Sequence, residues 1–207
     1  MTPNREAEVR RRGPRGAYGK TAARREAILD AALEVFGEAG YRAGSLREVA
    51  ARVGMTEAGL LHHFPSKGAL LTAVLEHRDE RSRMAEHDPD DGPAALLRFL
   101  DRARRNSAEP GVLELFCRLA AEATVPDHPA HGFFVRRYAE LRALLLRAFT
   151  DLERQGLLAP GVRPQSAVVS TIAVWDGLQL QWLLDRGALD IPDELRSHLT
   201  RLTTVPL

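Results

Sequence analysis

The chain has 207 residues, of which 44% are hydrophobic, and this is enough to bury a sizeable core in one or two small domains. Helix-forming residues dominate and no alternating runs rich in Val, Ile and Thr occur, so the sequence predicts an all-α fold. The formal net charge is only +1, and Cys117 is the only cysteine, which excludes an intrachain disulfide and fits a cytoplasmic location.

The N-terminal segment carries most of the charge asymmetry. Residues 1–25 hold eight Arg or Lys and two acids, so the remainder of the chain is mildly acidic. Residues 1–20 are polar with scattered Gly and Pro, which predicts a basic disordered arm. A basic arm ahead of an acidic body indicates a polyanion partner, although a simple solvated tail is the alternative. We expect no signal peptide, because this segment has no apolar core.

The first helix is predicted to begin near Thr21 and to end at Gly40, with apolar residues at helical spacing between them. "SLRE" follows at 45–48, and its Ser and Glu predict a capping box for a short helix. Gly54 ends that helix, and Thr56 caps a second short helix that reaches about His63. Two short helices joined by a tight turn form the helix-turn-helix layout, in which the second helix enters the major groove of DNA.

In the remaining two thirds of the chain, the sequence predicts longer helices. Ser66 should cap the first of them, over residues 66–86. The others are expected over residues 93–107, 111–123, 129–155, 164–186 and 192–203. This makes nine predicted helices, with prolines near several starts and glycines at several ends.

The segment 164–186 is apolar nearly all round. A helix of this kind must be buried on all sides, and pairing with its symmetry mate and with both C-terminal helices would achieve this. We therefore expect a homodimer. Asp176, Gln179 and Gln181 interrupt the apolar run, so we interpret it as a buried helix and expect no membrane partner. Asp176 needs a partner there: an arginine such as Arg142 or Arg147, the other subunit, or a ligand.

Three stretches carry a resemblance to a known family. They are "AILDAALEVFGEAGY" at 27–41, "SLREVAARVGMTEAGLLHHFPSKGALL" at 45–71, and within the latter the "HF.SK..L" core at 63–70. Together they resemble the DNA-binding domain of TetR-family transcriptional regulators, closely over about a quarter of the chain. The resemblance implies a nine-helix fold, with a helix-turn-helix domain at 21–66 and an effector-binding and dimerisation domain at 67–207. It also implies that the partners are double-stranded operator DNA, a second copy of the chain and a small-molecule effector.

The same resemblance assigns candidate DNA contacts. The positions that match the family's recognition helix are Thr56, Glu57, Ala58, Gly59, Leu61, His62 and His63. Lys67 matches the family's phosphate-contacting lysine, and Arg47 is a further candidate for the DNA backbone. Leu61 departs from the family, because many members carry a tyrosine there whose hydroxyl contacts phosphate. A leucine could instead pack against a thymine methyl group or a sugar.

Lys67 raises an electrostatic question. It falls in the first turn of its predicted helix, where the helix dipole disfavours a cation by about 0.3–1 kcal/mol. One interpretation is a surface lysine that tolerates this cost. The other is a phosphate bound jointly by the ammonium group and the N-terminal amides of the helix. Given the surrounding match, we favour the second.

An effector pocket would lie among the helices of the second domain. Candidates for its wall are Phe99, Leu113, Phe116, Cys117, Phe134, Tyr138 and Trp175. Each of these residues is equally consistent with a position in the hydrophobic core. Because the set is mainly apolar and aromatic, it indicates a hydrophobic or amphipathic effector. His128 and His131 have a spacing that permits a metal site, but no further ligand clusters with them, so we expect neither a metal nor a cofactor.

The sequence thus favours a homodimeric repressor that a small effector releases from its operator. The alternative is an architectural or effector-independent DNA-binding protein, which a body without an internal cavity would favour. A helical enzyme is disfavoured, because no activated nucleophile motif, glycine-rich phosphate loop or metal cluster is evident.

Overall fold

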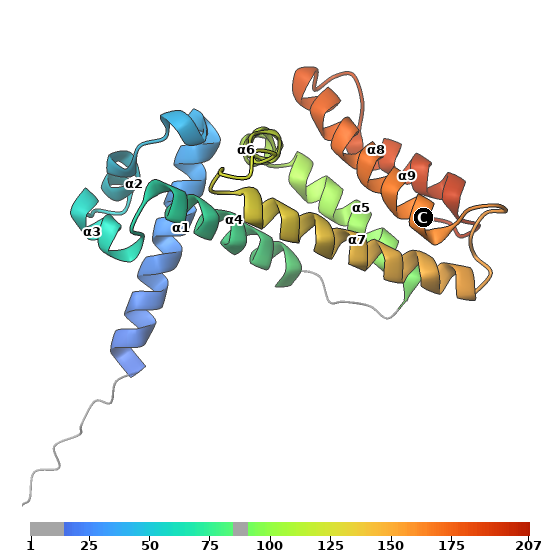
Figure 1. The fold of residues 1–207 in the computed structure, drawn as a ribbon, viewed down its shortest axis with the longest axis horizontal. Helices are drawn as coiled ribbons and strands as arrows, with labels where there is room; N and C mark the ends of the chain where they lie inside the picture. The colour runs from blue at the N-terminus through green and yellow to red at the C-terminus, as the bar shows by residue number, and fades with distance from the viewer. Residues whose placement is uncertain (1–14, 85–90) are drawn as a thin grey trace, which may run out of the picture.

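The computed structural model describes residues 15–84 and 91–207, and over these two ranges the chain forms nine α-helices (Figure 1). They are α1 Arg15–Ala43, α2 Leu46–Arg52, α3 Glu57–His63, α4 Lys67–Met84, α5 Gly92–Ser107, α6 Pro110–Glu122, α7 His131–Arg154, α8 Pro164–Leu184 and α9 Ile191–Leu202. The all-α prediction is confirmed, and each predicted boundary after the first lies within a few residues of the observed one.

The start of α1 differs from the prediction. The helix begins at Arg15 rather than near Thr21, so the last six residues of the predicted arm are helical, and residues 1–14 lie outside the described part of the chain. No proline interrupts the chain between Arg15 and Gly40, and nothing else there ends a helix. Gly40 does, with a φ of 76°, before one further turn to Ala43. The N-terminal half of α1 projects away from the rest of the molecule (Figure 1).

The turn between α2 and α3 depends on Gly54. Its φ of 63° lies in the left-handed region, and its N–H donates to the carbonyl of Ala51 at 3.1 Å. The N–H of Met55 donates to the carbonyl of Ala50 at 2.8 Å. These two bonds form a Schellman motif, which satisfies the last carbonyls of α2 and turns the chain sharply into α3. The predicted glycine turn is therefore present.

The N-terminus of α2 differs in detail from the predicted capping box. The Ser45 hydroxyl accepts from the N–H of Arg47, at 3.2 Å, and not from Glu48. Glu48 instead pairs with Arg52 at 3.1 Å, and the same guanidinium also binds two glutamates of α1. Glu48 therefore pairs within its own helix instead of capping it, and Arg52 is the residue that fastens α2 to α1.

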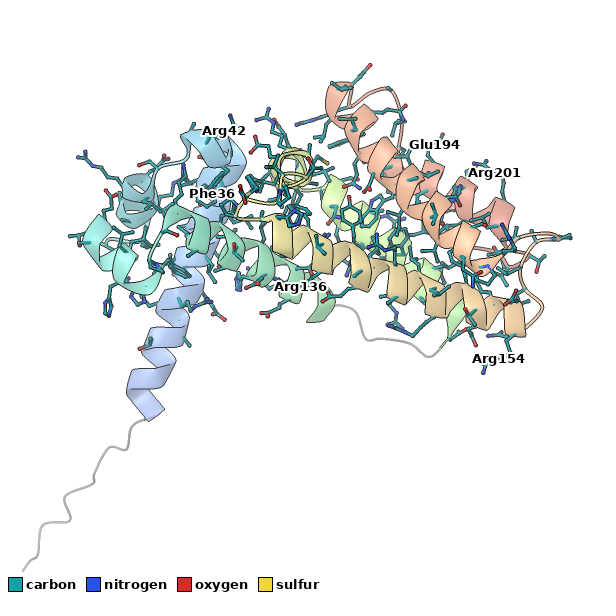
Figure 2. The ribbon with its side chains drawn as sticks, in the orientation of Figure 1. Phe36, Arg42, Arg136, Arg154, Glu194 and Arg201 are labelled. Carbon is teal, nitrogen blue, oxygen red and sulfur yellow. The ribbon has the colours of Figure 1, made fainter. Side chains whose placement is uncertain are left out.

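Two clusters of buried apolar residues hold the helices together. The first, which we call the head cluster, joins α1, α2, α3 and α4 to α6 and to the start of α7, and it includes the fully buried Phe36 that Figure 2 labels. The second joins α5, α7, α8 and α9, around residues such as Phe149 and Leu145. Tyr138 of α7 packs against both clusters. We refer to α1–α3 as the head and to α5–α9 as the body, with α4 connecting them.

α8 is half-covered in the single chain. It packs against α6, α7 and α9, and Val168, Trp175 and Leu178 are buried there. On its other side Val169 and Leu184 are 65% and 81% exposed. By length and composition alone, α8 is the one helix of the described ranges that could cross a membrane. Its packing within the body and its buried Thr171 and Gln179 are those of a core helix.

Candidate DNA-binding surface and effector pocket

α3 presents one face to the core and one to solvent. Leu60 is fully buried and Phe64, directly after the helix, is buried with it, which fixes α3 against α1 and α4. Thr56 caps the helix by accepting from the N–H of Gly59 at 3.1 Å. Leu61, 38% exposed, lies on the outer side. Of the other candidate contacts, the exposed residues are Arg47, Thr56, Glu57, Ala58 and His62, and the half-buried ones are Gly59, His63 and Lys67.

Lys67 lies where two helix ends meet. Its Nζ donates to the carbonyl oxygen of Arg42, at 2.8 Å, and lies 4.9 Å from the centre of the Tyr41 ring. Burial lowers the pKa of the ammonium group. The C-terminal end of α1 carries the partial negative charge that the N-terminus of α4 lacks. Lys67 therefore has a structural partner that the sequence alone did not reveal.

Arg25 is a candidate that the sequence analysis missed. It lies on the exposed side of α1, with its guanidinium carbon 5.1 Å from the centre of the Phe64 ring. This contact holds a cation beside the end of α3, on the side of the molecule that α3 occupies. Its basic charge was counted in the N-terminal segment, but only the packing of α1 on Phe64 places it at this surface.

A pocket opens between α4, α5, α6, α7 and α8. It contains about 380 Å³ of space not filled by atoms, including the solvent at its mouth. Its lining residues are Arg78, Asp79, Asn106, Val112, Leu113, Phe116, Arg137 and Gln179.

Two of the predicted wall residues, Leu113 and Phe116, line this pocket. Phe99 and Trp175 instead pack edge to face in the body core, with ring centres 4.6 Å apart. Phe134 is buried in the head cluster. The role of these three in binding an effector stays a prediction.

The charged lining residues were not predicted, although a signal for them exists. Asp79 lies four residues after the buried Leu75, and Arg137 lies between the buried Phe133 and Leu141 at the same spacing. Both therefore occupy positions on the inward stripe of their helices. Opposite charges on the inward stripes of two helices indicate a buried ion pair, and Arg137 does pair with Asp79.

A second polar contact lies close by, between α7 and α8. The Tyr138 hydroxyl donates to Oδ2 of Asp176 at 2.9 Å. Arg142 and Arg147, the arginines suggested as partners, both lie on the exposed side of α7, and another arginine of the same helix, Arg137, acts on Asp176 by lowering its pKa. Burial raises the pKa of Asp176, and burial together with this carboxylate raises the pKa of Tyr138 well above its ordinary value.

Cys117 lies on α6, with its Sγ 4.0 Å from Oε1 of Gln179. Burial and the nearby Asp176 raise the pKa of the thiol to about 11. A thiol with so high a pKa is a poor nucleophile at neutral pH. It serves here as a packing residue behind the pocket wall.

The two histidines considered for a metal have structural contacts. Nδ1 of His131 lies 2.8 Å from the carbonyl oxygen of Ala123, and Nδ1 of His128 accepts from the N–H of Ala130 at 3.2 Å. These bonds fix the loop before α7. Within residues 21–81 and 91–207, no group of three or more His, Cys, Asp or Glu side chains could hold a metal ion.

Comparison with known proteins agrees with this architecture. The family described as "Bacterial regulatory proteins, tetR family" matches residues 28–74, which run from α1 through α3 into α4. The HTH-type transcriptional repressor Rv1474c of Mycobacterium tuberculosis is 32% identical over 151 residues, 72% of this chain and 75% of that protein. This chain belongs to the TetR family. It is a helix-turn-helix transcriptional regulator, and not an enzyme.

Two further relatives extend the comparison of this TetR-family regulator. The A-factor receptor protein of Streptomyces griseus is 28% identical over 170 residues, which are 79% of this chain and 56% of the receptor. A TetR transcription regulator from Haloarcula marismortui has a TM-score of 0.73 at 21% identity, covering 87% of this chain and 95% of that one. At this identity the second likeness supports the fold alone.

Proposed function

We propose that this TetR-family regulator is a homodimeric repressor that binds double-stranded operator DNA through α3 and is released by a small effector. The observation that carries the proposal is the outer face of α3. A seven-residue helix is fixed by Leu60 and Phe64 and presents its other side to solvent directly after a tight turn. This is the geometry in which a recognition helix enters a major groove.

The residues of this surface divide by chemistry. Short side chains at Ala58 and Gly59 allow α3 to approach base edges closely, and Leu61 offers an apolar contact to a thymine methyl group. Arg47 and Lys67 supply cations for phosphates on either side of α3, and Arg25 supplies a third. Thr56, Glu57, His62 and His63 complete the candidate contacts.

The dimer is proposed from α8. Its outward side carries Val169, Ala173, Gly177, Leu180 and Leu184, and a Cβ added to Gly177 would meet nothing within 4 Å. An apolar stripe with a glycine near its middle suits close crossing of two helices. The neighbouring α9 is polar at its outer edge, where Figure 2 shows Glu194 and Arg201. Two copies of α8 and α9 would form a four-helix interface.

Effector release is proposed from the body pocket. A pocket between the connecting helix α4 and the body favours a ligand-responsive repressor over an architectural DNA-binding protein. The name of the Streptomyces griseus relative, a receptor, supports the same choice. An effector that fits only one arrangement of α4 and the body would shift the population of dimers away from the one that matches the operator.

We assign DNA binding and effector binding to the two domains that the sequence analysis predicted, with the boundary between residues 66 and 67. Residues 21–66 would bind DNA, and residues 67–207 would dimerise and bind the effector. The head cluster spans this boundary through α4, α6 and α7, which provides a mechanical link between the two functions. The protein would act in the cytoplasm, with no cofactor.

The test measures binding to the duplex DNA flanking the gene, as a function of salt, for the wild type, Lys67→Ala and the control Arg154→Ala at the C-terminal end of α7. Each phosphate contact contributes about 0.9 to the slope of log K against log salt. We expect Lys67→Ala to reduce the slope by about one unit, and Arg154→Ala to leave it unchanged. An unchanged slope in Lys67→Ala would remove Lys67 from the interface. A protein that stays monomeric at micromolar concentration would contradict the dimer.

A further inference from the structure

A buried ion pair connects the helix that carries the head to the helix at the centre of the body. Asp79 of α4 is 6% exposed, and its carboxylate pairs with the guanidinium of Arg137 on α7. Both residues line the pocket between α4 and α7. A molecule that enters this pocket therefore meets one of the contacts that fasten α4 to the body. Glu76 also binds Arg136 of α7 at 2.9 Å, and Arg78 binds Glu109 at 3.2 Å.

Arg137 is the group in this pocket that a ligand anion with an apolar part would meet. The lining contains two guanidinium groups and the carboxylate of Asp79, and Arg78 is already paired with Glu109 at 3.2 Å. Burial lowers the pKa of Arg137 and Arg78 lowers it further, while Tyr138, Asp176 and Glu140 act in the opposite direction, so a carboxylate in contact with the guanidinium would offset its desolvation. Arg137 also lies over the ring of Phe116, 5.2 Å from its centre, which places the cation next to an apolar wall.

The donors at this site suit a carboxylate. A guanidinium has five N–H donors in a plane and binds a carboxylate through two parallel bonds. Asp79 contacts Arg137 through Oδ1, and a ligand carboxylate would compete with Asp79 for the same guanidinium. The side-chain amides of Asn106 and Gln179 add donors to the same lining.

We propose that the effector is a compact amphipathic carboxylic acid whose carboxylate binds Arg137 in place of Asp79, and that loss of this ion pair weakens the attachment of α4 to α7, which Glu76 and Arg136 also maintain. The inference rests on the proposed function, because it names the ligand class and the switch of the same pocket. The apolar part of the acid lies against Leu113 and Phe116.

The consequence for the head follows from the continuity of α4. One helix carries both Lys67, at the DNA-binding surface, and Asp79, at the pocket. Its far end is also tied to α1, because Arg81 binds Asp30 at 2.8 Å and His77 lies 3.4 Å from the same carboxylate. A shift of α4 relative to α7 is therefore transmitted to α1, which must also change its packing against α6 and the start of α7.

The first experiment compares matched ligands on the wild-type protein. Calorimetry measures the affinity for phenylacetate, phenylacetamide and 2-phenylethylammonium, and for octanoate, octanamide and octylammonium. Hydrogen bonds to a charged group are stronger than neutral ones, so at least one acid should bind about tenfold more tightly than its amide. The proposal is overturned if the amide equals the acid, if the ammonium compound binds best, or if no acid binds.

The second experiment uses variants and the acid that binds best. Arg137→Gln should lose the preference for acid over amide, whereas the control Arg154→Gln, at the opposite end of α7 (Figure 2), should retain it. Asp79→Asn removes the competitor of the ligand, so it should bind the acid several-fold more tightly and bind DNA more weakly without ligand. Retained preference in Arg137→Gln, or wild-type DNA affinity in Asp79→Asn, contradicts the switch.

The two proposals fail in different ways. If the wild type binds no DNA but prefers the acid through Arg137, the function is wrong and the ligand site stands. If it binds DNA with the expected salt dependence but does not distinguish acid from amide, the function stands and the carboxylate inference is wrong.

Discussion

Nζ of Lys67 lies 2.8 Å from the carbonyl oxygen of Arg42, so the first residue of α4 binds the last turn of α1. An ammonium group disfavoured by the dipole of its own helix is thereby stabilised by the end of another. Lys67 has three N–H donors, and this bond uses one of them. The contact therefore holds the cation in place at the proposed DNA-binding surface without preventing it from binding a phosphate.

The Arg42 contact predicts a stability effect for Lys67. Lys67→Met keeps the aliphatic stem but removes a hydrogen bond from a charged donor and the contact with Tyr41, while it relieves the dipole penalty. The net loss should be about 1 kcal/mol in the free energy of unfolding, measured by urea denaturation. Arg118→Met, which removes only an exposed pair with Glu114 on α6, is the control and should cost no more than about 0.5 kcal/mol. Equal losses would mean that the Arg42 contact contributes nothing.

Two adjacent leucines of α3 should separate folding from recognition. Leu60→Ala leaves a cavity in the head cluster and should cost about 2–5 kcal/mol in the free energy of unfolding. Leu61→Ala, on the outer side, should cost less than about 1 kcal/mol but weaken DNA binding. Thermal unfolding and DNA binding of both variants check this. A stable Leu60→Ala, or full DNA affinity in Leu61→Ala, would contradict the orientation of α3.

Asp176 predicts a pH dependence of stability. Burial raises its pKa above the ordinary value of 3.8, so at neutral pH the fold bears the cost of an ionised carboxylate. Asp176→Asn still accepts from Tyr138 and should raise the free energy of unfolding at pH 7 by about 1 kcal/mol. The gain should disappear as pH falls through the raised pKa towards 3.8, because the wild-type carboxyl is then neutral in both states.

Denaturation curves of Asp176→Asn and of the exposed control Asp101→Asn, at pH 7 and pH 4, test this prediction. The control should change by less than about 0.5 kcal/mol. A loss of stability in Asp176→Asn at pH 7 would mean that the charge of Asp176, acting on Arg137, stabilises the fold.

Cys117 should react slowly. A pKa of about 11, against an ordinary 9.0, leaves about a hundredfold less thiolate at pH 8. Alkylation by iodoacetamide should be slower than in the urea-unfolded chain by at least this factor, and should accelerate as pH rises through 9 and 10. Equal rates in the folded and unfolded protein would show that the thiol is accessible and ionised.

The local features of the fold could be predicted from the sequence, because helix caps and breakers act within a few residues. Thr56 and Gly54 are examples, and both have the roles that their positions predict. The partner of Asp176 could not, since it depends on which helix lies alongside. Asp176 meets Tyr138, although the sequence offered charged alternatives on the same helix. The partner of Glu48, by contrast, is Arg52 four residues further along α2, a pair at ordinary helical spacing that the sequence analysis did not consider.

The candidate DNA-binding residues could be assigned by family resemblance, because the helix-turn-helix is continuous in the chain. The pocket is assembled from five helices, and its wall was predicted on apolar and aromatic character alone. Leu113 and Phe116 were found in this way. Arg137 and Asp79 were not predicted as lining residues. The ion-pair partner of an inward-facing charge depends on which helix packs opposite it, and the sequence alone does not give that packing.

Selection of binding sites from a pool of randomised DNA duplexes tests the central claim most directly. A dimer with two α3 surfaces should enrich two related half-sites in inverted orientation, with centres about one helical turn or a multiple of it apart. Addition of the acid identified by calorimetry should release these duplexes. Failure to enrich any sequence, or enrichment of a single half-site without a symmetric partner, would contradict the account.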